Sequence, residues 1–390
     1  MKMQLKRKTV LVTGAEGFVG KNLCLSLAQL PDVELLKYDI GNTEAELRGF
    51  VEKADFVFHL AGVNRPKMPE EFTTGNTDFT KRLIDLLSET NRNIPVLISS
   101  SIQADLDNPY GKSKLAAEEI VFQYRKRVQT PCYVYRLANV FGKWCRPNYN
   151  SAVATWCYNI ARGLPIQVRD REATVTLVYI DDVVTAFIQS FRMALNNPEG
   201  DMLGCHVNEY CSVSESYTRK LGEITDLLYG FQKAREDLSV PDQGDPFTRK
   251  LYATYLSYLP EDSFSYPLAM HTDNRGSFTE FIRTSERGQV SVNVSRPGIT
   301  KGNHWHHTKH EKFLVVSGRA VIRFRRMDQA DSPIIEYPVS GEKLEVVEIP
   351  PGYTHSIENV GDADLVTVMW ANEPFDPKRP DTVAEPVICG

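Results

Sequence analysis

Near the C-terminal end of the chain, histidine and glutamate residues recur at spacings that suit a metal ion. His304 and His306 lie two positions apart, so on a β-strand their side chains point to the same face of the sheet. Glu311 could reach that face from the next strand, and His355 follows a Pro-Pro-Gly turn. Three imidazoles and one carboxylate form a nitrogen and oxygen ligand set for a divalent transition metal, and we expect zinc. The expected metal ligands are therefore His304, His306, Glu311 and His355.

A glycine-rich turn near the N-terminus suits a dinucleotide. Gly14, Gly17 and Gly20 follow an apolar run and precede a helical stretch. Such glycines permit a tight turn and a close approach of the backbone to a pyrophosphate, and the helix N-terminus supplies N–H donors. Asp39 stands about where an acidic residue meets the ribose 2′-hydroxyl. The candidate cofactor-binding residues are Gly14, Gly17, Phe18, Gly20, Asp39, Leu60, Ala61, Tyr110 and Lys114.

A tyrosine and a lysine four positions apart suit proton transfer. Tyr110 and Lys114 share a face of an expected helix, and a lysine one turn away can lower the pKa of a phenol from about 10. Ser101 ends an expected strand, where its hydroxyl can polarise a carbonyl. Together these three residues suit proton delivery during hydride transfer to a ketone.

Composition excludes several classes of protein. At 390 residues, the chain is long enough for two domains, and its net charge of −5 gives no reason to expect nucleic acid as a partner. It has no apolar run near the ~20 residues that cross a bilayer, and its N-terminal apolar run is too short for a signal peptide. The seven cysteines are scattered, which favours a reducing compartment without a disulfide framework. We therefore expect a cytoplasmic protein without membrane insertion.

The pattern of strands and helices divides the chain into two parts. The expected strands of the first part are 8–12, 33–39, 55–62 and 96–101, and its expected helices are 21–30, 77–90 and 112–127. This alternation predicts a doubly wound α/β fold of the Rossmann type. Short strands with Gly and Pro turns then continue to about residue 372, which predicts an all-β barrel. The expected domains are 1–245 and 266–390, with a linker at 246–265.

The N-terminal half, residues 8–240, resembles the extended short-chain dehydrogenase/reductase family. The matching motifs are Thr-Gly-x-x-Gly-x-x-Gly, Asp-x-x-x-His-x-Ala, Ser-Ser-Ser and Tyr-x-x-x-Lys. The resemblance implies an NAD(P)-dependent enzyme acting on nucleotide sugars, with Ser101, Tyr110 and Lys114 as its catalytic residues. Ser101 and Tyr110 are only nine residues apart, which is shorter than is usual in the family. The loop that often covers the substrate is therefore missing.

Substrate-binding candidates follow from the same resemblance. Relatives hold the nucleotide diphosphate on the stretch that corresponds to residues 144–151. Arg146, Asn150 and Arg171 are chemically suitable groups, since a guanidinium pairs bidentately with phosphate oxygens. Asn139 belongs to a further matching motif, Arg-Leu-Ala-Asn-Val-Phe-Gly.

The histidine segment resembles the two cupin motifs. The first runs from Gly298 through His-x-His and Glu311 to Gly318, and the second is Pro-x-Gly-x-x-His-x-x-x-Asn, ending at Asn359. The leading glycine of the second motif, Gly341, lies further upstream than usual. The resemblance implies a cupin barrel that holds a divalent metal.

Two stretches ahead of the histidines, 273–281 and 289–298, resemble a particular cupin group, the dTDP-4-dehydrorhamnose 3,5-epimerase-like proteins. These epimerise carbons next to a keto group on a nucleotide sugar. Their catalytic histidine stands where His304 stands here, yet they hold no metal there. His304 therefore has two competing roles, ligand or base. Lys301 is a candidate proton donor or enolate stabiliser, and we expect the metal to be mainly structural.

Over its full length the chain resembles a family of two-module capsular polysaccharide synthesis enzymes. The segments 59–66, 141–145 and 302–309 carry this resemblance. It implies C3 epimerisation of UDP-2-acetamido-2,6-dideoxy-β-L-arabino-hexos-4-ulose in a zinc-containing cupin. NADPH-dependent C4 reduction to UDP-2-acetamido-2,6-dideoxy-β-L-talose follows, on the pathway to UDP-N-acetyl-L-fucosamine. It also implies a homodimer.

Two alternatives stay open on the sequence alone. Asp39 fits NADH at least as well as NADPH, because a carboxylate suits a free ribose 2′-hydroxyl. The chain could also be a single-activity 4-ketosugar reductase whose cupin is a structural or dimerising module. C3 exchange would separate that reading from the two-site reading.

Overall fold

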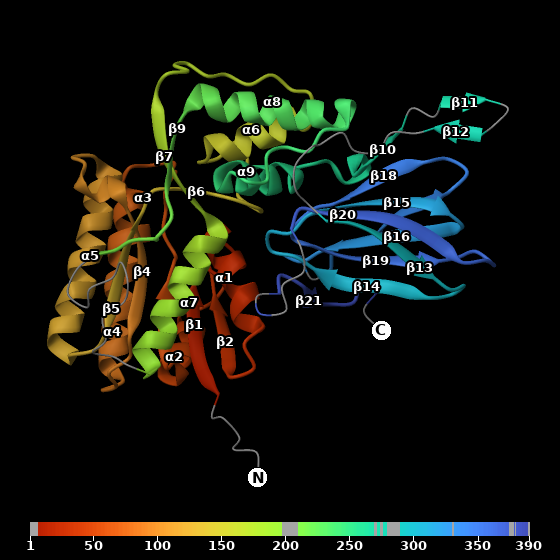
Figure 1. The fold of residues 1–390 in the computed structure, drawn as a ribbon. Helices are drawn as coiled ribbons and strands as arrows, with labels where there is room; N and C mark the ends of the chain where they lie inside the picture. The colour runs from red at the N-terminus through yellow and green to blue at the C-terminus, as the bar shows by residue number, and fades with distance from the viewer. Residues whose placement is uncertain are drawn as a thin grey trace, which may run out of the picture. The chain divides into compact units, whose positions relative to one another are not determined.

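The structure is a computed structural model that describes residues 7–196, 210–268, 271–273, 276–278, 289–329, 331–373, 378 and 380–388. The chain forms two compact units, coloured along the sequence in Figure 1. Unit 1 comprises Met1–Val140 and Thr176–Thr218, and unit 2 comprises Phe141–Val175 and Arg219–Gly390. These units describe packing, and the domain boundaries at 245 and 265 stay a prediction.

Unit 1 contains a six-stranded sheet in the order β2–β1–β3–β4–β5–β8, with every pair parallel. Its strands are β1 (Lys8–Thr13), β2 (Val33–Tyr38), β3 (Phe56–His59), β4 (Val96–Ser101), β5 (Cys132–Leu137) and β8 (Tyr210–Cys211). The central strands are nearly continuous buried apolar runs, as a parallel sheet covered on both faces requires. The predicted parallel α/β fold is confirmed.

Helices cover both faces of this sheet. They are α1 (Phe18–Ala28), α2 (Glu44–Lys53), α3 (Glu70–Phe72), α4 (Phe79–Glu89), α5 (Pro109–Val128) and α7 (Ile180–Asn196). A π-helical turn, η1 (Thr73–Asp78), leads into α4, and a 3₁₀ turn, η2 (Ile102–Asp105), follows β4. Good caps fix two helix starts: Thr43 and Glu46 form a capping box on α2, and Asn108 caps α5 ahead of Pro109.

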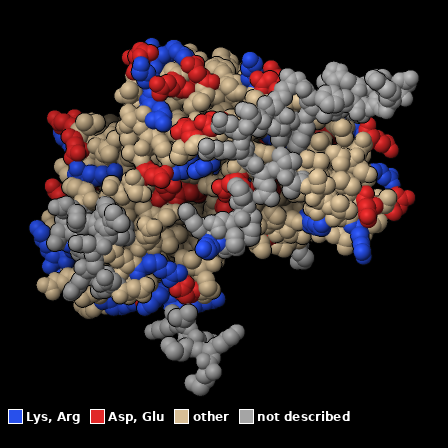
Figure 2. Space-filling view, in the orientation of Figure 1, with Lys and Arg blue, Asp and Glu red and all other residues tan. Residues whose placement is uncertain are grey.

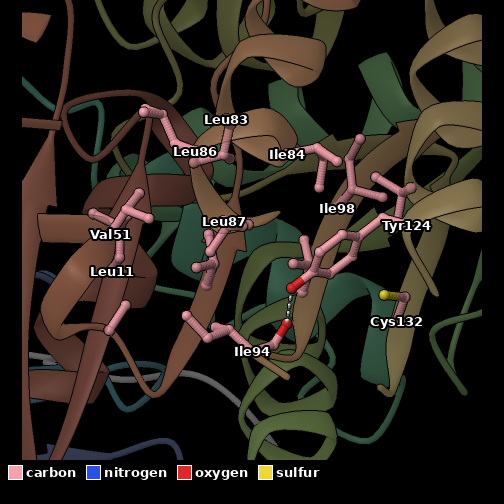
Figure 3. Packing of buried hydrophobic residues seen from close by; sticks show 14 of the residues in the cluster. Leu11, Val51, Leu83, Ile84, Leu86, Leu87, Ile94, Ile98, Tyr124 and Cys132 are labelled. Carbon is pink, nitrogen blue, oxygen red and sulfur yellow. Dashed lines mark hydrogen bonds between the residues drawn. The ribbon is translucent and has the colours of Figure 1, made fainter. Parts of the chain in front are cut away.

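The two faces of the sheet have separate cores because neighbouring strand residues point to opposite sides. One core joins the sheet to α2, α4 and α5, and its side chains include Leu11, Val51, Leu83, Leu87, Ile98 and Tyr124 (Figure 3). The Tyr124 hydroxyl, at the centre of that view, donates a 3.0 Å hydrogen bond to the Ile94 carbonyl. On the opposite face, Phe56 and Phe58 pack against Phe191 of α7.

Unit 2 begins with helices. They are α6 (Ala152–Ile160), α8 (Leu221–Asp237) and α9 (Pro246–Leu256). The segment 246–265, predicted as a linker, thus contains a helix capped by Asp245, and most of that helix is buried. Pro246 at the first position of this helix is a common helix start signal, but the surrounding residues favour a linker. A separate three-stranded sheet has the order β6 (Asn139–Phe141), β7 (Thr174–Tyr179), β9 (Tyr217–Lys220), and each of these strands includes residues assigned to both units.

The rest of unit 2 is built of antiparallel strands in two five-stranded sheets. One has the order β10 (Ser265–Pro267), β18 (Glu345–Ile349), β15 (Glu311–Ser317), β20 (Leu365–Ala371), β13 (Gln289–Ser295). The other has the order β17 (Ile335–Ser340), β16 (Arg319–Arg326), β19 (Tyr353–Asn359), β14 (Thr300–Trp305), β21 (Val383–Ala384). A short 3₁₀ turn, η3 (Glu261–Ser263), and a two-stranded pair, β11 (His271–Asp273) and β12 (Gly276–Phe278), complete the described elements.

The two five-stranded sheets contact each other through side chains. The rings of Phe313 on β15 and His355 on β19 are 5.7 Å apart. The predicted all-β content after residue 266 is therefore confirmed, whereas the described strands form two open sheets rather than one closed barrel.

Two further predictions from composition can be compared with the structure. Among the described helices, none has both the length and the apolar character needed to cross a bilayer. On the face drawn in Figure 2, basic and acidic side chains are interspersed, as the modest net charge suggests. Cys211 is disulfide-bonded, whereas Cys24, Cys132, Cys145 and Cys157 are free. Spacing in the sequence does not show which thiols folding brings together.

Candidate functional site

The glycine turn of unit 1 lies against the end of a neighbouring strand. Gly14 has a φ of +69°, and a Cβ on it would lie 2.6 Å from the backbone nitrogen of Ala61. A Cβ on Gly20 would lie 2.0 Å from the Gly14 carbonyl oxygen. Larger residues are therefore excluded at both glycines, by the left-handed backbone at one and by contact at both. The turn leaves bare backbone between β1 and α1, which Phe18 begins, and this suits a pyrophosphate.

Asp39 lies beside this turn, at the end of β2. Its carboxylate accepts hydrogen bonds of 2.8 Å from the backbone N–H groups of Glu16 and Ile40. Leu60, the first residue after β3, donates from its backbone to the Thr13 carbonyl at 3.1 Å. The predicted cofactor residues thus stand at the carboxyl ends of three adjacent strands, the usual place for a ligand of a doubly wound sheet.

The three predicted catalytic residues come from β4 and the start of α5. Ser101 is the last residue of β4, and Tyr110 is the second residue of α5. The hydroxyls of Tyr110 and Ser101 are hydrogen-bonded to each other. The Lys114 ammonium donates to the Ser99 carbonyl at 3.1 Å and lies beside Gly62, where a Cβ would be 3.2 Å away. A tyrosine, a serine and a lysine are therefore gathered at one edge of the sheet.

The electrostatics of these residues differ from the expectation. Burial raises the pKa of Tyr110, and the hydrogen bond from Ser101 only partly opposes this. Burial also lowers the pKa of Lys114 to about 8, although the nearby Glu118 carboxylate opposes it. The pKa of Tyr110 thus shifts in the direction opposite to the expected one, because loss of solvation outweighs the interaction with Ser101. The phenol is a proton donor at neutral pH.

Two polar residues that were not predicted support this site. The His59 ring bridges the hydroxyls of Thr13 and Thr80, at 2.8 Å each. Thr80 donates to the Asn76 carbonyl, so His59 must donate from Nε2 and accept at Nδ1. Burial lowers the pKa of His59 to about 3, so the ring is neutral. His59 stands in the Asp-x-x-x-His-x-Ala motif, which is a signal that could have identified it.

Asn76 is the second unpredicted residue. It lies in the π-helical turn η1, and its amide donates to Ser113 Oγ at 2.9 Å and to the Val63 carbonyl at 3.0 Å. Its Oδ1 accepts from the Val63 N–H at 2.7 Å. The amide thereby links the segment after β3 to α5, one residue before Lys114. No sequence pattern marks this asparagine within a polar stretch.

A buried ion pair lies behind the lysine. Glu118 is on α5, one turn after Lys114, and it is fully buried. Arg136 binds its two carboxylate oxygens at distances of 2.7 to 3.2 Å, and the Ser100 hydroxyl donates to it as well. The Arg136 guanidinium also stacks 3.7 Å from the centre of the Tyr210 ring. Both charges are therefore neutralised within the fold.

The predicted substrate-binding residues are distributed over both units. Asn139 is exposed in unit 1 and donates to the Thr176 carbonyl at 3.2 Å. In unit 2, Arg146 stacks on the Tyr149 ring, and Asn150 is exposed. Arg171 forms two hydrogen bonds, of 2.7 and 2.8 Å, to the Asp226 carboxylate. A phosphate would have to compete with that carboxylate for Arg171.

The four predicted metal ligands converge in unit 2. Potential ligand atoms of His304, His306, Glu311 and His355 all lie within 4.8 Å of one another. One Glu311 oxygen is 3.6 Å from His306 Nε2 and 3.5 Å from His355 Nε2. His304 lies on β14, His306 follows the end of that strand, and His355 lies on β19 of the same sheet, whereas Glu311 begins β15 of the facing sheet. The cluster therefore bridges the two sheets.

Unpartnered atoms show that this cluster fits a cation. His306 Nε2, Glu311 Oε2 and both ring nitrogens of His355 are buried and have no hydrogen-bond partner. Buried polar atoms without partners are costly, and a divalent ion would satisfy His306 Nε2, Glu311 Oε2 and one of the two His355 nitrogens together. The other ring nitrogen of His306 donates to the Asp381 carbonyl at 2.5 Å, which leaves Nε2 as the ligand atom. The Asp381 carboxylate in turn accepts from three backbone N–H groups of residues 307–309.

The charge states within the cluster also suit a cation. Burial and the neighbouring His355 ring lower the pKa of His304 to about 4. Burial alone would raise the pKa of Glu311, but His306 and His355 hold it well below its usual range. Neutral imidazole and ionised carboxylate are the forms that bind metals. The pKa of His306 is instead raised, because the Glu311 carboxylate outweighs its burial. The cluster thus has ligand types that fit a divalent ion.

Lys301 lies on β14 with the histidines, but its side chain is held elsewhere. Its ammonium donates to the Asn293 side chain at 2.6 Å and to the Val294 carbonyl at 2.8 Å, both on β13. His307, which follows His306, is not one of the four; its ring lies 4.4 Å from the Trp305 ring, tilted by 54°.

Comparison with known proteins assigns both halves of the chain. The NAD dependent epimerase/dehydratase family matches residues 10–205, and the polysaccharide biosynthesis C-terminal domain matches residues 271–383. A protein of Pseudomonas aeruginosa named UDP-2-acetamido-2,6-beta-L-arabino-hexul-4-ose reductase is 47% identical over 375 residues, which are 96% of this chain and 98% of that protein.

Solved structures agree with these matches. The crystal structure of the capsular polysaccharide assembling protein CapF from Staphylococcus aureus is similar over 97% of this chain and 100% of that chain, with 50% identity and a TM-score of 0.65. A UDP-glucuronic acid 4-epimerase from Bacillus cereus, in complex with UDP-glucuronic acid and NAD, has 18% identity and a TM-score of 0.50 over 57% of this chain and 82% of that chain, and shows the fold alone. The glycine turn beside Asp39 thus suits a nicotinamide dinucleotide, and the chain belongs to the NAD dependent epimerase/dehydratase family.

Proposed function

We propose that this protein acts twice on one nucleotide sugar, UDP-2-acetamido-2,6-dideoxy-β-L-arabino-hexos-4-ulose. It inverts C3 in the β-sheet part of unit 2 and then reduces the C4 ketone in unit 1. The product is UDP-2-acetamido-2,6-dideoxy-β-L-talose, on the pathway to UDP-N-acetyl-L-fucosamine and capsular polysaccharide. The observation that supports the reduction is the 47% identity, over 96% of this chain, to a reductase named for that ketosugar. The epimerisation rests on the resemblance of the C-terminal half to nucleotide-sugar epimerases.

The reduction uses the residues gathered at the edge of the parallel sheet. A bound nicotinamide cofactor would supply the hydride to C4. Tyr110 donates its phenolic proton to the carbonyl oxygen, so that hydride and proton together make the alcohol. Ser101 donates a hydrogen bond to the same oxygen, and the positive charge of Lys114 stabilises the phenolate that remains. Resemblance favours NADPH, whereas the Asp39 carboxylate beside the glycine turn favours NADH.

The epimerisation precedes the reduction for a chemical reason. The C3 proton is acidic only while the C4 ketone can accept the electrons as an enolate. Removal of the proton and its return on the other face invert C3, and reduction then fixes the new configuration. We assign this step to a cupin formed by the two five-stranded sheets. Lys301 and His304 are the candidates for the proton transfers.

The cluster of His304, His306, Glu311 and His355 would hold one zinc ion. Bound there, zinc would link the facing sheets and supply positive charge near the mouth of the cupin. Because the cluster bridges two sheets and its atoms are buried, we assign the ion a mainly structural role. Removing it should then destabilise the fold of unit 2 more than it impairs chemistry.

The nucleotide would be held by the loop after β6. Arg146 and Asn150 are the proposed diphosphate ligands, with Arg171 after release from Asp226. Asn139 is a separate substrate-binding candidate in unit 1. We further propose that the active protein is a homodimer.

A second reading has its own support. The matching relative is named only as a reductase, and the Lys301 ammonium is bound to Asn293 and Val294. On that reading the C-terminal part holds metal and stabilises or dimerises the protein without reacting with sugar.

One experiment separates these readings. The full-length protein is incubated with the 4-keto sugar in deuterated water without NADPH or NADH, and the substrate is analysed for deuterium at C3. Two-site action predicts catalysed exchange, followed by reduction when reduced cofactor is added. Reduction without any enzyme-dependent exchange would leave the single-activity reductase as the function.

A further inference from the structure

A strained tryptophan in unit 2, Trp144, contacts a backbone turn that is bonded to the histidine cluster. Trp144 lies in the loop between β6 and α6, in the stretch proposed to hold the nucleotide. Its φ of +67° places a bulky side chain in the left-handed region, which non-glycine residues rarely adopt. Such backbone strain persists only where the surroundings enforce it, and it often marks a functional position.

The loop itself is firmly anchored around this residue. The Tyr258 hydroxyl lies in hydrogen-bonding contact with the carbonyls of Gly142 and Cys145, on either side of Trp144. Lys143 is only 1% exposed, although it carries an ammonium group. The unusual conformation of Trp144 is therefore part of a packed structure.

The indole packs on Gly352, at the turn that enters β19. The three atoms nearest to a Cβ built on Gly352 all belong to Trp144, at 2.7 Å for Cζ2, 3.0 Å for Cε2 and 3.2 Å for Nε1. Gly352 itself has a φ of +81°, so it must be glycine on two independent grounds. Any side chain there would displace the indole.

Gly352 is bonded to the backbone of a metal-ligand candidate. Its N–H donates to the His306 carbonyl at 3.1 Å, and its carbonyl accepts from the Met327 N–H at 3.0 Å. Three residues later the same segment supplies His355. One turn thus connects two of the four histidine-cluster residues, and the indole covers that turn.

We propose that Trp144 is a positioning residue for the histidine cluster. The indole holds the turn at Gly352, and the turn holds His306 and the start of the strand that carries His355. A residue of the reductase sequence thereby sets the affinity of the metal site. The proposal rests on the proposed metal site and goes beyond it, because Trp144 offers no ligand atom.

Two substitutions of Trp144 test this in the full-length protein. Glycine removes the indole but accommodates the positive φ, so Trp144→Gly should fold well. Zinc affinity, measured by competition with a chromophoric chelator, should fall at least ~10-fold, the usual effect of a group that orients metal ligands. Trp144→Phe keeps a ring against Gly352 and should restore affinity to within about 3-fold. Tyr229→Ala, an exposed aromatic on α8, is the control and should have no effect.

A cobalt spectrum gives a readout that general stability would not move. In cobalt-substituted protein, the visible bands report the geometry of the ligands around the ion. They should shift in Trp144→Gly and return towards wild type in Trp144→Phe. Unchanged bands and unchanged zinc affinity in a folded Trp144→Gly protein would overturn the proposal.

A double-mutant cycle tests the contact itself. Gly352→Ala should lower zinc affinity strongly in the wild-type chain, because the methyl group meets the indole at 2.7 Å. It should cost at least ~10-fold less in the Trp144→Gly background, where that space is vacated. Equal costs in both backgrounds would show that the contact carries no coupling. If the wild-type chain binds no zinc, the metal site and this proposal both fail. If the wild-type chain binds zinc and the Trp144 variants bind it equally tightly, this proposal alone fails.

Discussion

The two candidate sites of this protein differ in how their polar groups are satisfied. In unit 1, Lys114, His59 and Asn76 each have hydrogen-bond partners within the fold. In unit 2, the histidine cluster leaves four buried atoms without partners. The first site is complete in the protein alone and needs only substrate and cofactor. The second leaves buried nitrogen and oxygen atoms unpaired at a cost, and this is why we propose a cation there.

The substitution Tyr110→Phe tests this difference with the largest expected effect. Removing the phenolic proton donor should lower C4 reduction by ~10²–10⁴-fold, since general acid groups typically contribute that much. C3 exchange should be unaffected, because the histidine cluster lies in the other unit. Reduction is followed by oxidation of the cofactor, and exchange is followed by mass spectrometry. Tyr229→Phe is the control, and loss of both activities in a folded Tyr110→Phe protein would contradict two independent sites.

The complementary test removes metal ligands from unit 2. Glu311→Gln and His355→Ala should each lower zinc affinity by ~10²-fold or more, since orienting groups alone are worth 10–100-fold. Metal content by elemental analysis should fall from about one per chain. His307→Ala is the matched control, because its ring contacts Trp305 and is not one of the four clustered residues. Full retention of zinc by both ligand variants would show that the cluster was wrongly chosen.

A third test uses the buried lysine of unit 1. A pKa depressed to about 8 corresponds to on the order of 3 kcal/mol against the charged form. Lys114→Met should therefore stabilise the cofactor-free protein at pH 7, by on the order of 1–2 kcal/mol once the lost hydrogen bond to Ser99 is subtracted. The same variant should abolish reduction. The control is Lys112→Met, whose ammonium is exposed and paired with exposed Asp107.

The pH dependence of this effect has a definite sign. The folded pKa of Lys114 is lower than the unfolded one, so below pH 8 both states hold the proton and the folded state bears the full penalty. As pH rises from about 8 towards 10.5, only the unfolded chain holds it, and the stability advantage of Lys114→Met should shrink. Denaturant unfolding at pH 7 and pH 10 measures this, and an advantage that grows with pH would refute it.

The smallest expected effect concerns the choice of cofactor. The Asp39 carboxylate beside the glycine turn should repel a 2′-phosphate. Asp39→Asn keeps an oxygen that can accept from Glu16 but removes the charge. It should shift the ratio of kcat/KM for NADPH over NADH towards NADPH by roughly 10-fold, about what one screened charge contributes. If Asp39→Asn leaves the ratio of kcat/KM for NADPH over NADH unchanged, Asp39 does not contact the ribose 2′ position of the cofactor.

The features that depend on local spacing could be predicted from the sequence alone. The glycine turn, the Tyr-x-x-x-Lys pair and the alternation of strands and helices are short-range patterns, so the parallel fold of unit 1 could be predicted. The four histidine-cluster residues could also be predicted, since strand periodicity places His304 and His306 on one face. Glu311 is expected on the next strand, and His355 is expected after the Pro-Pro-Gly turn.

The features that depend on burial and on distant partners could be found only from the folded structure. Loss of solvation raises the pKa of Tyr110, although its neighbour in sequence suggested the opposite. The pairing of Arg171 with Asp226, the bridging ring of His59 and the contact of Trp144 with Gly352 join residues far apart in the chain. A single sequence encodes these contacts only through the whole fold, because each requires two elements to pack first.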